Sequence, residues 1–408
     1  MNTKIRLTLM NFLQYAVWGA WLISLGAYLG NTLKFDGLQI GSFFATMGIA
    51  SLFMPAVMGI IADRWIPAQR LLGLCHLFAA GFITLAATRT DYNSLYTLVL
   101  LSVMFYMPTI ALSNSVAYNA LEKAGLDTVT HFPPIRVWGT VGFICAMWVV
   151  DLGKMGLSAT QLYFSATLGL ILGLYSFTLP NCPINRSGGG KSIVDLLGLR
   201  AFALFKQRKM AIFFIFSMLL GMSLQITNAF ADGYIKSFGD TGIHGAKYLG
   251  TFGVEHSTIL ISLSQISETL CILLIPFFLK RFGIKRVMLI AIFAWVLRFA
   301  LLGAGNPGPG VWMFILSMIV YGVAFDFFNI SGSLFVEKET SAAIRSSAQG
   351  VFMIMTNGLG ALIGSYLAGW VVNHYGWPLS WYLFAGFSLV VAIVFAVIFK
   401  YKHDPNRI

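Results

Sequence analysis

Charged residues are scarce in this sequence, and that scarcity excludes a soluble fold. Only 10% of the 408 residues are Asp, Glu, Lys or Arg, whereas 58% are hydrophobic and the mean hydropathy is +0.79. Soluble domains carry about 25% charged residues and at most about 50% apolar ones. A transmembrane helix needs about 20 mostly apolar residues, so the chain has room for about twelve spans and for no sizeable soluble domain.

Cysteine and catalytic motifs are scarce as well. The four cysteines, Cys75, Cys145, Cys182 and Cys271, show no CxxC or metal-ligand spacing, which argues against a disulfide framework and against a metal site. The sequence has no HExxH, no serine nucleophile elbow and no P-loop, the motifs of several enzyme classes. We therefore expect no enzyme, no metal and no cofactor. A receptor is disfavoured because no extramembrane domain is present to read a signal.

The basic residues that are present indicate membrane topology. With both termini in the cytoplasm, twenty of the 27 Lys and Arg residues fall on the cytoplasmic side, five fall on the opposite side, and two lie inside spans. This asymmetry follows the positive-inside rule and accounts for the net charge of +12 without a nucleic-acid partner. We expect a multi-pass protein of a bacterial inner membrane that works as a monomer in the lipid bilayer.

Long apolar stretches predict an all-α polytopic membrane protein with twelve transmembrane helices. The predicted spans are 8–31, 37–61, 71–89, 94–119, 133–152, 160–180, 210–233, 254–279, 286–304, 310–335, 346–373 and 378–399. The interruption at 181–209 contains a glycine run and then an amphipathic stretch, which is either a helix on the membrane surface or a plain linker. It divides a six-helix bundle at 1–180 from another at 210–408, which predicts two pseudo-symmetric halves.

Two tight basic turns stand at matching places in these halves. The first, between the second and third spans, contains Gly59, Asp63 and Arg64 and matches the G-x-x-x-D-R core of the loop signature of the major facilitator superfamily. The second occupies 279–286. In a gating role, Asp63 would cap a helix N-terminus and Arg64 would engage a helix C-terminus, which would close the cytoplasmic side. A generic positive loop is the alternative.

A charge in the middle of a span costs at least about 2.5–3.5 kcal/mol, so each one requires an explanation. Four charged residues qualify: Arg136, Glu268, Arg298 and Asp326. Arg136 shares one helical face with Thr140 and Phe143, at spacings of four and seven. A guanidinium, a hydroxyl and an aromatic ring on one stripe suit a ligand that is both polar and flat. The alternative is an arginine anchored at the membrane interface.

Amides accompany the acidic groups in neighbouring spans. Gln225 and Asn228 lie three residues apart in the seventh span, and Gln265 and Glu268 have the same spacing in the eighth. Amides in spans often only join helices. Together with a carboxylate, however, they can donate to and accept from the vicinal hydroxyls of a sugar.

The tenth span combines aromatic and acidic residues. Tyr321 and Phe325 share a face and would either sandwich a ring or pack against other helices. Asp326 would either pair with Arg298 or act in transport. Glu268 and Asp326 are the two acidic groups placed to carry a coupling proton within the membrane.

These residues resemble the bacterial nucleoside:proton symporters of the major facilitator superfamily over nearly the whole chain. The most specific motifs are Phe12-Leu13-Gln14 with Trp18-Gly19, Thr32-Leu33-Lys34-Phe35-Asp36-Gly37, Phe132-Pro133-Pro134-Ile135-Arg136, Gln225-Ile226-Thr227-Asn228, Ser264-Gln265-Ile266-Ser267-Glu268-Thr269, Phe325-Asp326-Phe327-Phe328-Asn329-Ile330-Ser331-Gly332 and Phe335-Val336-Glu337-Lys338-Glu339.

The resemblance implies uptake of purine and pyrimidine nucleosides, such as uridine and adenosine, together with protons. It also implies a substrate cavity between the two halves. In similar proteins the cavity is lined by positions that match Arg136, Thr140, Phe143, Gln225, Asn228, Gln265, Glu268, Tyr321 and Phe325. Asp326 matches an acidic position implicated in transport. The alternative is a proton-coupled sugar or glycoside transporter of the same fold, because the amides suit either ligand.

Overall fold

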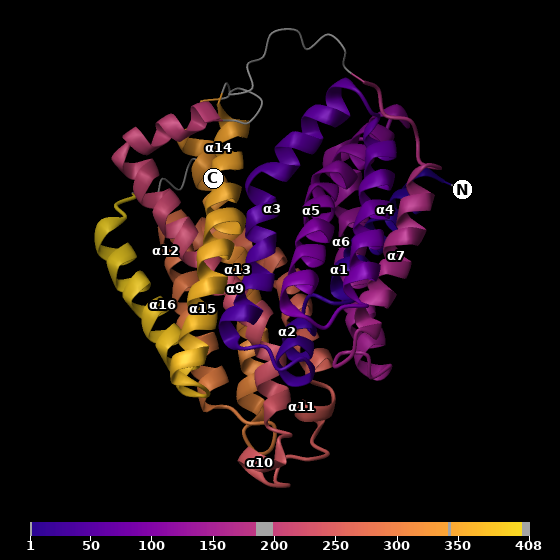
Figure 1. Ribbon diagram of the computed structural model, residues 1–408. Coiled ribbons are helices and arrows are strands. Elements are labelled where there is room, and N and C mark those ends of the chain that lie inside the picture. The colour runs from indigo at the N-terminus through magenta and orange to yellow at the C-terminus, as the bar shows by residue number, and fades with distance from the viewer. Residues whose placement is uncertain (1, 185–198, 342–343, 402–408) are drawn as a thin grey trace. The chain divides into compact units, whose positions relative to one another are not determined.

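The computed structural model describes residues 2–184, 199–341 and 344–401, except for the side chains of Asp63, Val129, Leu199, Arg200, Ala201 and Ser346. The chain divides into two compact units (Figure 1). Unit 1 comprises residues 1–35 and 46–197, and unit 2 comprises residues 36–45 and 198–408. Each unit is built from helices.

Unit 1 contains the helices that Figure 1 draws from indigo to magenta. In chain order they are α1 (Thr3–Gly19), α2 (Leu25–Ala27), η1 (Tyr28–Thr32), α3 (Gly37–Arg64), α4 (Ala68–Ala86), α5 (Tyr92–Lys123), α6 (Thr128–Leu152) and α7 (Thr160–Ser176). The first ten residues of the segment that holds α3, 36–45, group with unit 2. Within unit 1, α1 packs on α6, and α4 packs on both α5 and α7.

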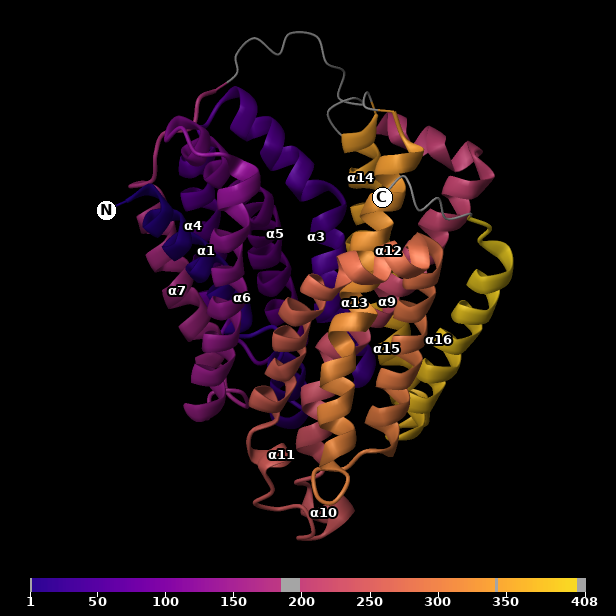
Figure 2. The ribbon, with the colours of Figure 1, turned by 180° about the vertical axis from the view of Figure 1, so that it is seen from behind.

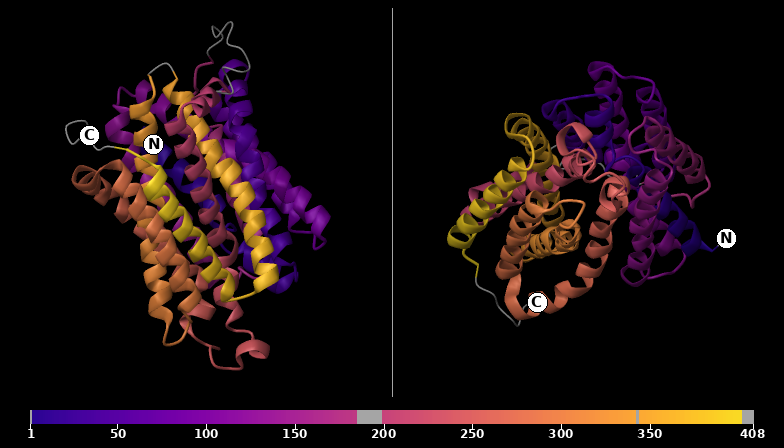
Figure 3. Two further views of the ribbon diagram at one scale, coloured as in Figure 1. Left: turned by 90° about the vertical axis from the view of Figure 1, so that its left-hand side faces the viewer. Right: turned by 90° about the horizontal axis from the view of Figure 1, so that it is seen from below.

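Unit 2 contains the remaining helices, which Figure 2 shows from behind. They are η2 (Leu199–Lys206), α9 (Arg208–Ser237), α10 (Thr241–His244), α11 (Phe252–Glu255), α12 (Ser257–Ala304), α13 (Val311–Glu339), α14 (Arg345–Met353), η3 (Ile354–Gly360), α15 (Ala361–Tyr375) and α16 (Leu379–Ile398). The helix α12 packs on α13 and on α16, whose yellow ribbon is clear in Figure 3. Of the amphipathic stretch expected in 181–209, the described residues include η2 and the start of α9.

The helices account for twelve spans. Nine helices in the described part of the chain are long and apolar enough to cross a membrane. One of them, α12, has 48 residues and contains two spans, because Gly283 interrupts it with non-helical backbone at φ 75° and ψ 166°. The helices α1 and α7, of 17 residues each, supply the other two. The predicted all-α polytopic fold is thus confirmed, and the helices of the described residues are consistent with twelve spans.

Glycine permits the closest helix contact in unit 1. A Cβ atom on Gly142 of α6 would collide with the backbone of Phe12 in α1, and one on Gly19 would collide with the backbone of Phe143. Small residues allow helix backbones to approach in this way, and this approach replaces the hydrophobic driving force that is absent in lipid. The contact fixes α6, which carries Arg136 and Phe143, against α1.

A buried carboxylate fixes a helix junction in unit 2. Asp232 of α9 is only 1% exposed. It accepts hydrogen bonds from the hydroxyls of Ser257 (2.5 Å) and Thr258 (3.1 Å), in the first turn of α12, and from the Lys236 ammonium (2.7 Å). An acidic group at a helix N-terminus is also favoured by the helix dipole. Asp232 therefore holds the start of α12 against α9.

Candidate functional site

The predicted residues of the fifth span lie on α6 in unit 1. Arg136 is half-buried, and its guanidinium carbon lies 3.9 Å from the centroid of the Tyr15 ring on α1. A cation over an aromatic face gains about 0.5–2 kcal/mol, more where water is excluded. Thr140 follows one turn later and is also half-buried. The aromatic face of Tyr15 thus orients the Arg136 guanidinium from a second helix.

An aromatic wall continues from this point. Trp18 of α1 lies edge-to-face with Phe143, with ring centroids 6.4 Å apart, and its centroid is 5.7 Å from that of Tyr106 on α5. The Trp18 indole nitrogen is buried and has no hydrogen-bond partner among the described residues. An unpaired buried donor of this kind requires an explanation, and a ligand is one. Unit 1 therefore presents a cation, a hydroxyl and an aromatic wall.

Behind this wall, Gln14 joins three helices through hydrogen bonds. Its amide nitrogen donates to the Thr109 hydroxyl (2.7 Å), and its amide oxygen lies 2.8 Å from His76 Nε2. Because the amide oxygen can only accept, the hydrogen of the imidazole is on Nε2. The Tyr106 hydroxyl also donates to the Gln14 carbonyl (2.8 Å). Gln14 thus holds α1 to α4 and α5.

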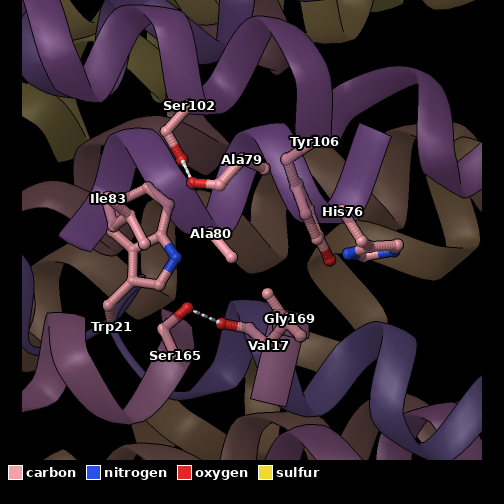
Figure 4. Close-up of a pocket in the computed structure, with 10 residues that line it drawn as sticks. All are labelled: Val17, Trp21, His76, Ala79, Ala80, Ile83, Ser102, Tyr106, Ser165 and Gly169. Carbon is pink, nitrogen blue, oxygen red and sulfur yellow. Dashed lines mark hydrogen bonds between the residues drawn. The ribbon is translucent and has the colours of Figure 1, made fainter. Parts of the chain in front are cut away.

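A small pocket beside His76 contains no free polar hydroxyl (Figure 4). Among the residues that line it, Ser102 donates to the Ala79 carbonyl (2.9 Å) and Ser165 donates to the Val17 carbonyl (2.7 Å). The remaining lining is mostly apolar or aromatic. His76 Nδ1 is buried without a partner among the described residues, but because both serine hydroxyls are bonded, the pocket offers a polar ligand few groups.

The predicted amides of unit 2 have no such partners. The side-chain oxygens of Gln225 on α9 and Gln265 on α12 are buried and accept no hydrogen bond from any described residue. Amides that serve to join helices would be bonded to each other or to backbone groups. Burial without a partner costs about 1–3 kcal/mol. These two amides therefore fit a ligand site better than a helix contact. Asn228 lies three residues along α9 and is half-buried.

The aromatic residues of α13 form a stack. The rings of Tyr321 and Phe325 are nearly parallel, at 9°, with centroids 5.7 Å apart. Trp295 of α12 stands edge-on to Tyr321 at 6.0 Å. The two rings of α13 contact each other and do not stand apart to enclose a third ring. A flat ligand would pack on the outer face of the pair.

Arg298 and Asp326 are not joined by an ion pair in the described part of the chain. Arg298 donates to the Ser317 carbonyl (2.7 Å), and its guanidinium carbon lies 4.6 Å from the Tyr321 ring centroid. Asp326 is 4% exposed, and one of its carboxylate oxygens has no hydrogen-bond partner among the described residues. Glu268 is close enough to Asp326 and Tyr321 for electrostatic interaction. Asp326 therefore remains available for a role in transport.

The predicted gating pair is described only in part. Arg64 is the last residue of α3, where a cation is favoured by the helix dipole. The side chain of Asp63 lies outside the described residues. No group of three or more His, Cys, Asp or Glu residues that could hold a metal ion occurs in the part of the chain that was described.

The site residues thus fall into two sets. Arg136, Thr140 and Phe143 lie on one helix of unit 1, and the other six lie on α9, α12 and α13 of unit 2. Sequence reasoning missed Tyr15, Trp18 and Trp295 as members of the site. The motif that includes Trp18 carried the family resemblance, but a ring that packs on a functional residue has no spacing signal of its own.

The comparisons with known proteins agree with this chemistry. A sequence profile of the family described as "Nucleoside H+ symporter" matches residues 1–404. The chain is 51% identical to the nucleoside permease NupG of Escherichia coli (strain K12) over 410 residues, which cover 99% of this chain and 97% of the relative. It is 49% identical to the xanthosine permease of the same organism over 415 residues, with 100% and 98% covered.

A solved structure shares the fold as well. The crystal structure of the nucleoside transporter NupG superimposes with a TM-score of 0.91 at 51% identity and covers 98% of this chain and 100% of that chain. A bacterial homologue of the lysosomal transporter Spinster has a TM-score of 0.68 at 14% identity, covering 97% and 96%, which supports the fold alone. The relatives named here are transporters or permeases and not enzymes.

Proposed function

Because this chain belongs to the nucleoside H+ symporter family, we propose that it carries purine and pyrimidine nucleosides across the membrane together with protons. The observation that supports this best is that unit 2 holds both buried amide oxygens without a hydrogen-bond partner among the described residues and a pair of stacked aromatic rings. The amide oxygens of Gln225 and Gln265 supply hydrogen-bonding groups, and the stacked rings of Tyr321 and Phe325 supply the surface. A nucleoside has both a ribose with hydroxyls and a flat base.

We assign the ribose to the amides and the carboxylate of unit 2. Gln265 and Glu268 would bind the vicinal hydroxyls, since an amide donates and accepts while a carboxylate accepts. Gln225 and Asn228 would bind from α9. The base would pack on Tyr321 and Phe325. Arg136, with Thr140 and Phe143 beside it, would bind the polar edge of the base.

Glu268 and Asp326 would carry the coupling proton. A carboxyl group that binds a proton in one conformation and releases it in the other links substrate movement to the proton gradient. The electrostatic contact between the two acids means that the charge on one affects the other. We therefore treat them as one proton site with two members.

Transport would proceed by alternating access of the two six-helix halves, 1–180 and 210–408, as in other transporters built from repeats. Asp63 and Arg64 would act at the cytoplasmic gate. The chain would work as a monomer in the bacterial inner membrane with both termini in the cytoplasm, as the excess of basic residues on that side indicates.

Uptake of labelled uridine and adenosine into proteoliposomes tests the proposal. An inward proton gradient should drive accumulation of the nucleoside. A protonophore should abolish the part of this accumulation that exceeds uptake without a gradient. Glu268→Gln and Arg136→Ala should each reduce uptake at least about tenfold, or about 1.4 kcal/mol of transition-state stabilisation, without loss of folded protein. If the protonophore leaves accumulation unchanged, transport is not coupled to protons. Competition by free ribose or lactose as strong as that by uridine would instead indicate a sugar transporter.

A further inference from the structure

A second pocket in unit 2 extends beyond the residues that the sequence predicted. It lies among α9, α12, α13 and η3, and it shares Phe325 with the candidate site. Trp295 and Phe328 supply further aromatic lining, and Asn329 and Asn357 supply amides. The pocket is thus chemically similar to the candidate site and adjoins it through one ring.

The local backbone of η3 brings Asn357 to this pocket. Residues Ile354–Gly360 form a π-helix, which adds one residue to the helical turn and changes the direction of the side chains that follow. A Cβ atom on Gly221 of α9 would collide with the Thr356 carbonyl, so η3 lies directly against α9. π-Helical turns are frequent at functional sites, because they are retained despite their poorer geometry.

The two amides at this pocket have capacity for a ligand. Asn329 is half-buried, and its side chain forms no hydrogen bond with any described residue. The Asn357 amide nitrogen faces only the Met353 sulfur, at 3.8 Å, and sulfur is a weak acceptor. Thr356 differs, because its hydroxyl donates to the Phe352 carbonyl at 2.9 Å. Of the polar side chains in the pocket, the amides are therefore the ones free to bind.

The arrangement along α13 also suits an extended ligand. Tyr321, Phe325 and Asn329 follow one another at four-residue spacing on one face, over about 12 Å of helix axis. Glu268 interacts electrostatically with Tyr321 at one end, and the pocket amides lie at the other. A ribose bound near Glu268 would leave its base directed along Phe325 toward Asn329.

We propose that Asn329 and Asn357 form a subsite that recognises the N7 edge of purine nucleosides, a role that rests on the proposed nucleoside transport. A carboxamide both donates and accepts, and it pairs with the N7 and N6 groups on one edge of adenine. Pyrimidines have no such edge. These two asparagines therefore determine how well purines are bound relative to pyrimidines.

Uptake of three labelled nucleosides into proteoliposomes tests this subsite: adenosine, 7-deazaadenosine, which lacks the N7 acceptor, and uridine. In Asn357→Leu and Asn329→Leu, the KM for adenosine should rise at least about tenfold while that for uridine stays within about threefold. The native protein should prefer adenosine to 7-deazaadenosine, and the Asn357→Leu variant should lose that preference. Exposed Asn93 in α5 provides the matched control, and Asn93→Leu should change none of these values.

Equal losses for all three nucleosides, or unchanged KM values, would overturn the subsite. Asn357→Ser and Asn329→Ser, which keep a small polar side chain, give the same readout if a leucine variant does not fold. Failure of the native protein to take up any nucleoside would contradict the proposed function itself. That result is seen before any variant is compared, so the two failures are distinguishable.

Discussion

Gln14 in unit 1 and Gln225 in unit 2 are both glutamines buried within membrane-spanning helices, yet their surroundings differ. The amide of Gln14 is bonded at both ends, to Thr109 and His76. The amide oxygen of Gln225 has no partner among the described residues. The first glutamine joins helices, and the second has hydrogen-bonding capacity left for a ligand. The difference shows that partners, and not residue type or depth, separate a structural amide from a functional one.

The largest effect is expected when a fully bonded polar group is removed from unit 2, which tests whether such groups carry stability there too. Asp232→Ala leaves the Lys236 ammonium without its carboxylate in a position where its side chain is only 12% exposed. Breaking a buried pair in this way costs about 3–5 kcal/mol. We expect a marked fall in the melting temperature of the detergent-solubilised protein. The melting temperature of Asp232→Asn should fall less. A variant as stable as the native protein would show that bonding within unit 2 does not carry stability.

Gln14→Leu tests the bonded glutamine. The substitution leaves the His76 Nε2 hydrogen buried without an acceptor, which costs about 1–3 kcal/mol. The melting temperature should fall, and the uptake that remains per folded molecule should keep the native KM. Gln14→Glu is the matched variant: it retains an acceptor for His76 but loses the N–H that is donated to Thr109. A large rise in KM with unchanged stability would contradict a structural role for Gln14.

Gln225→Leu, the same exchange at the unpartnered position, should give the opposite pattern. The Gln225 amide oxygen loses no hydrogen bond to a described residue, so the melting temperature without substrate should stay the same or rise. Uptake of uridine should fall about tenfold, equivalent to about 1.4 kcal/mol. The stabilisation of the purified protein by added uridine should fall as well, because a ligand stabilises only what it binds. A destabilised protein with native affinity would reverse our assignment.

A hydrogen-bonded polar group contributes least to stability where it is exposed, as the Asp91 carboxylate is. Asp91 caps α5 by accepting from the Ser94 backbone nitrogen (2.9 Å), and the hydrogen bonds from Ser94 lower the pKa of Asp91. Since the folded-state pKa is lowered, this stabilisation is present above the ordinary aspartate pKa of about 3.9 and is lost as the pH falls through the lowered value. Asp91→Asn should remove this small acid dependence from the melting temperature measured between pH 7 and pH 3. An unchanged acid dependence in Asp91→Asn would contradict the stabilising role of this cap.

Composition predicted the fold well because membrane spanning depends on long apolar segments, which local sequence encodes directly. The boundaries were less accurate where geometry intervened. The eighth and ninth spans were expected as separate helices with a turn at 279–286, and Gly283 does separate them, but within α12 only this one residue has non-helical backbone. The π-helix η3 was not anticipated, because no residue pattern distinguishes an extra residue in a turn from an ordinary helix.

The candidate residues could be predicted from charge and helical spacing, but their contacts could not. Spacing placed Tyr321 and Phe325 on one face without indicating that their rings stack on each other. It gave no sign that Arg136 lies over Tyr15, because the two residues are on different helices. The sequence also treats Gln14 and Gln225 alike. Only the positions of neighbouring donors and acceptors separate them.

The single-residue joint at Gly283 has a practical consequence for work on this protein. Its positive φ, 75°, is a conformation that residues with a Cβ rarely adopt, and the glycine is buried. The connection between the two spans is therefore only one residue long and leaves no slack for an inserted epitope or fusion partner, although Lys280, Arg281 and Arg286 beside it are exposed. Reporter groups are better placed in the connection that follows α12, at the exposed Pro309, where turn residues already separate two helices.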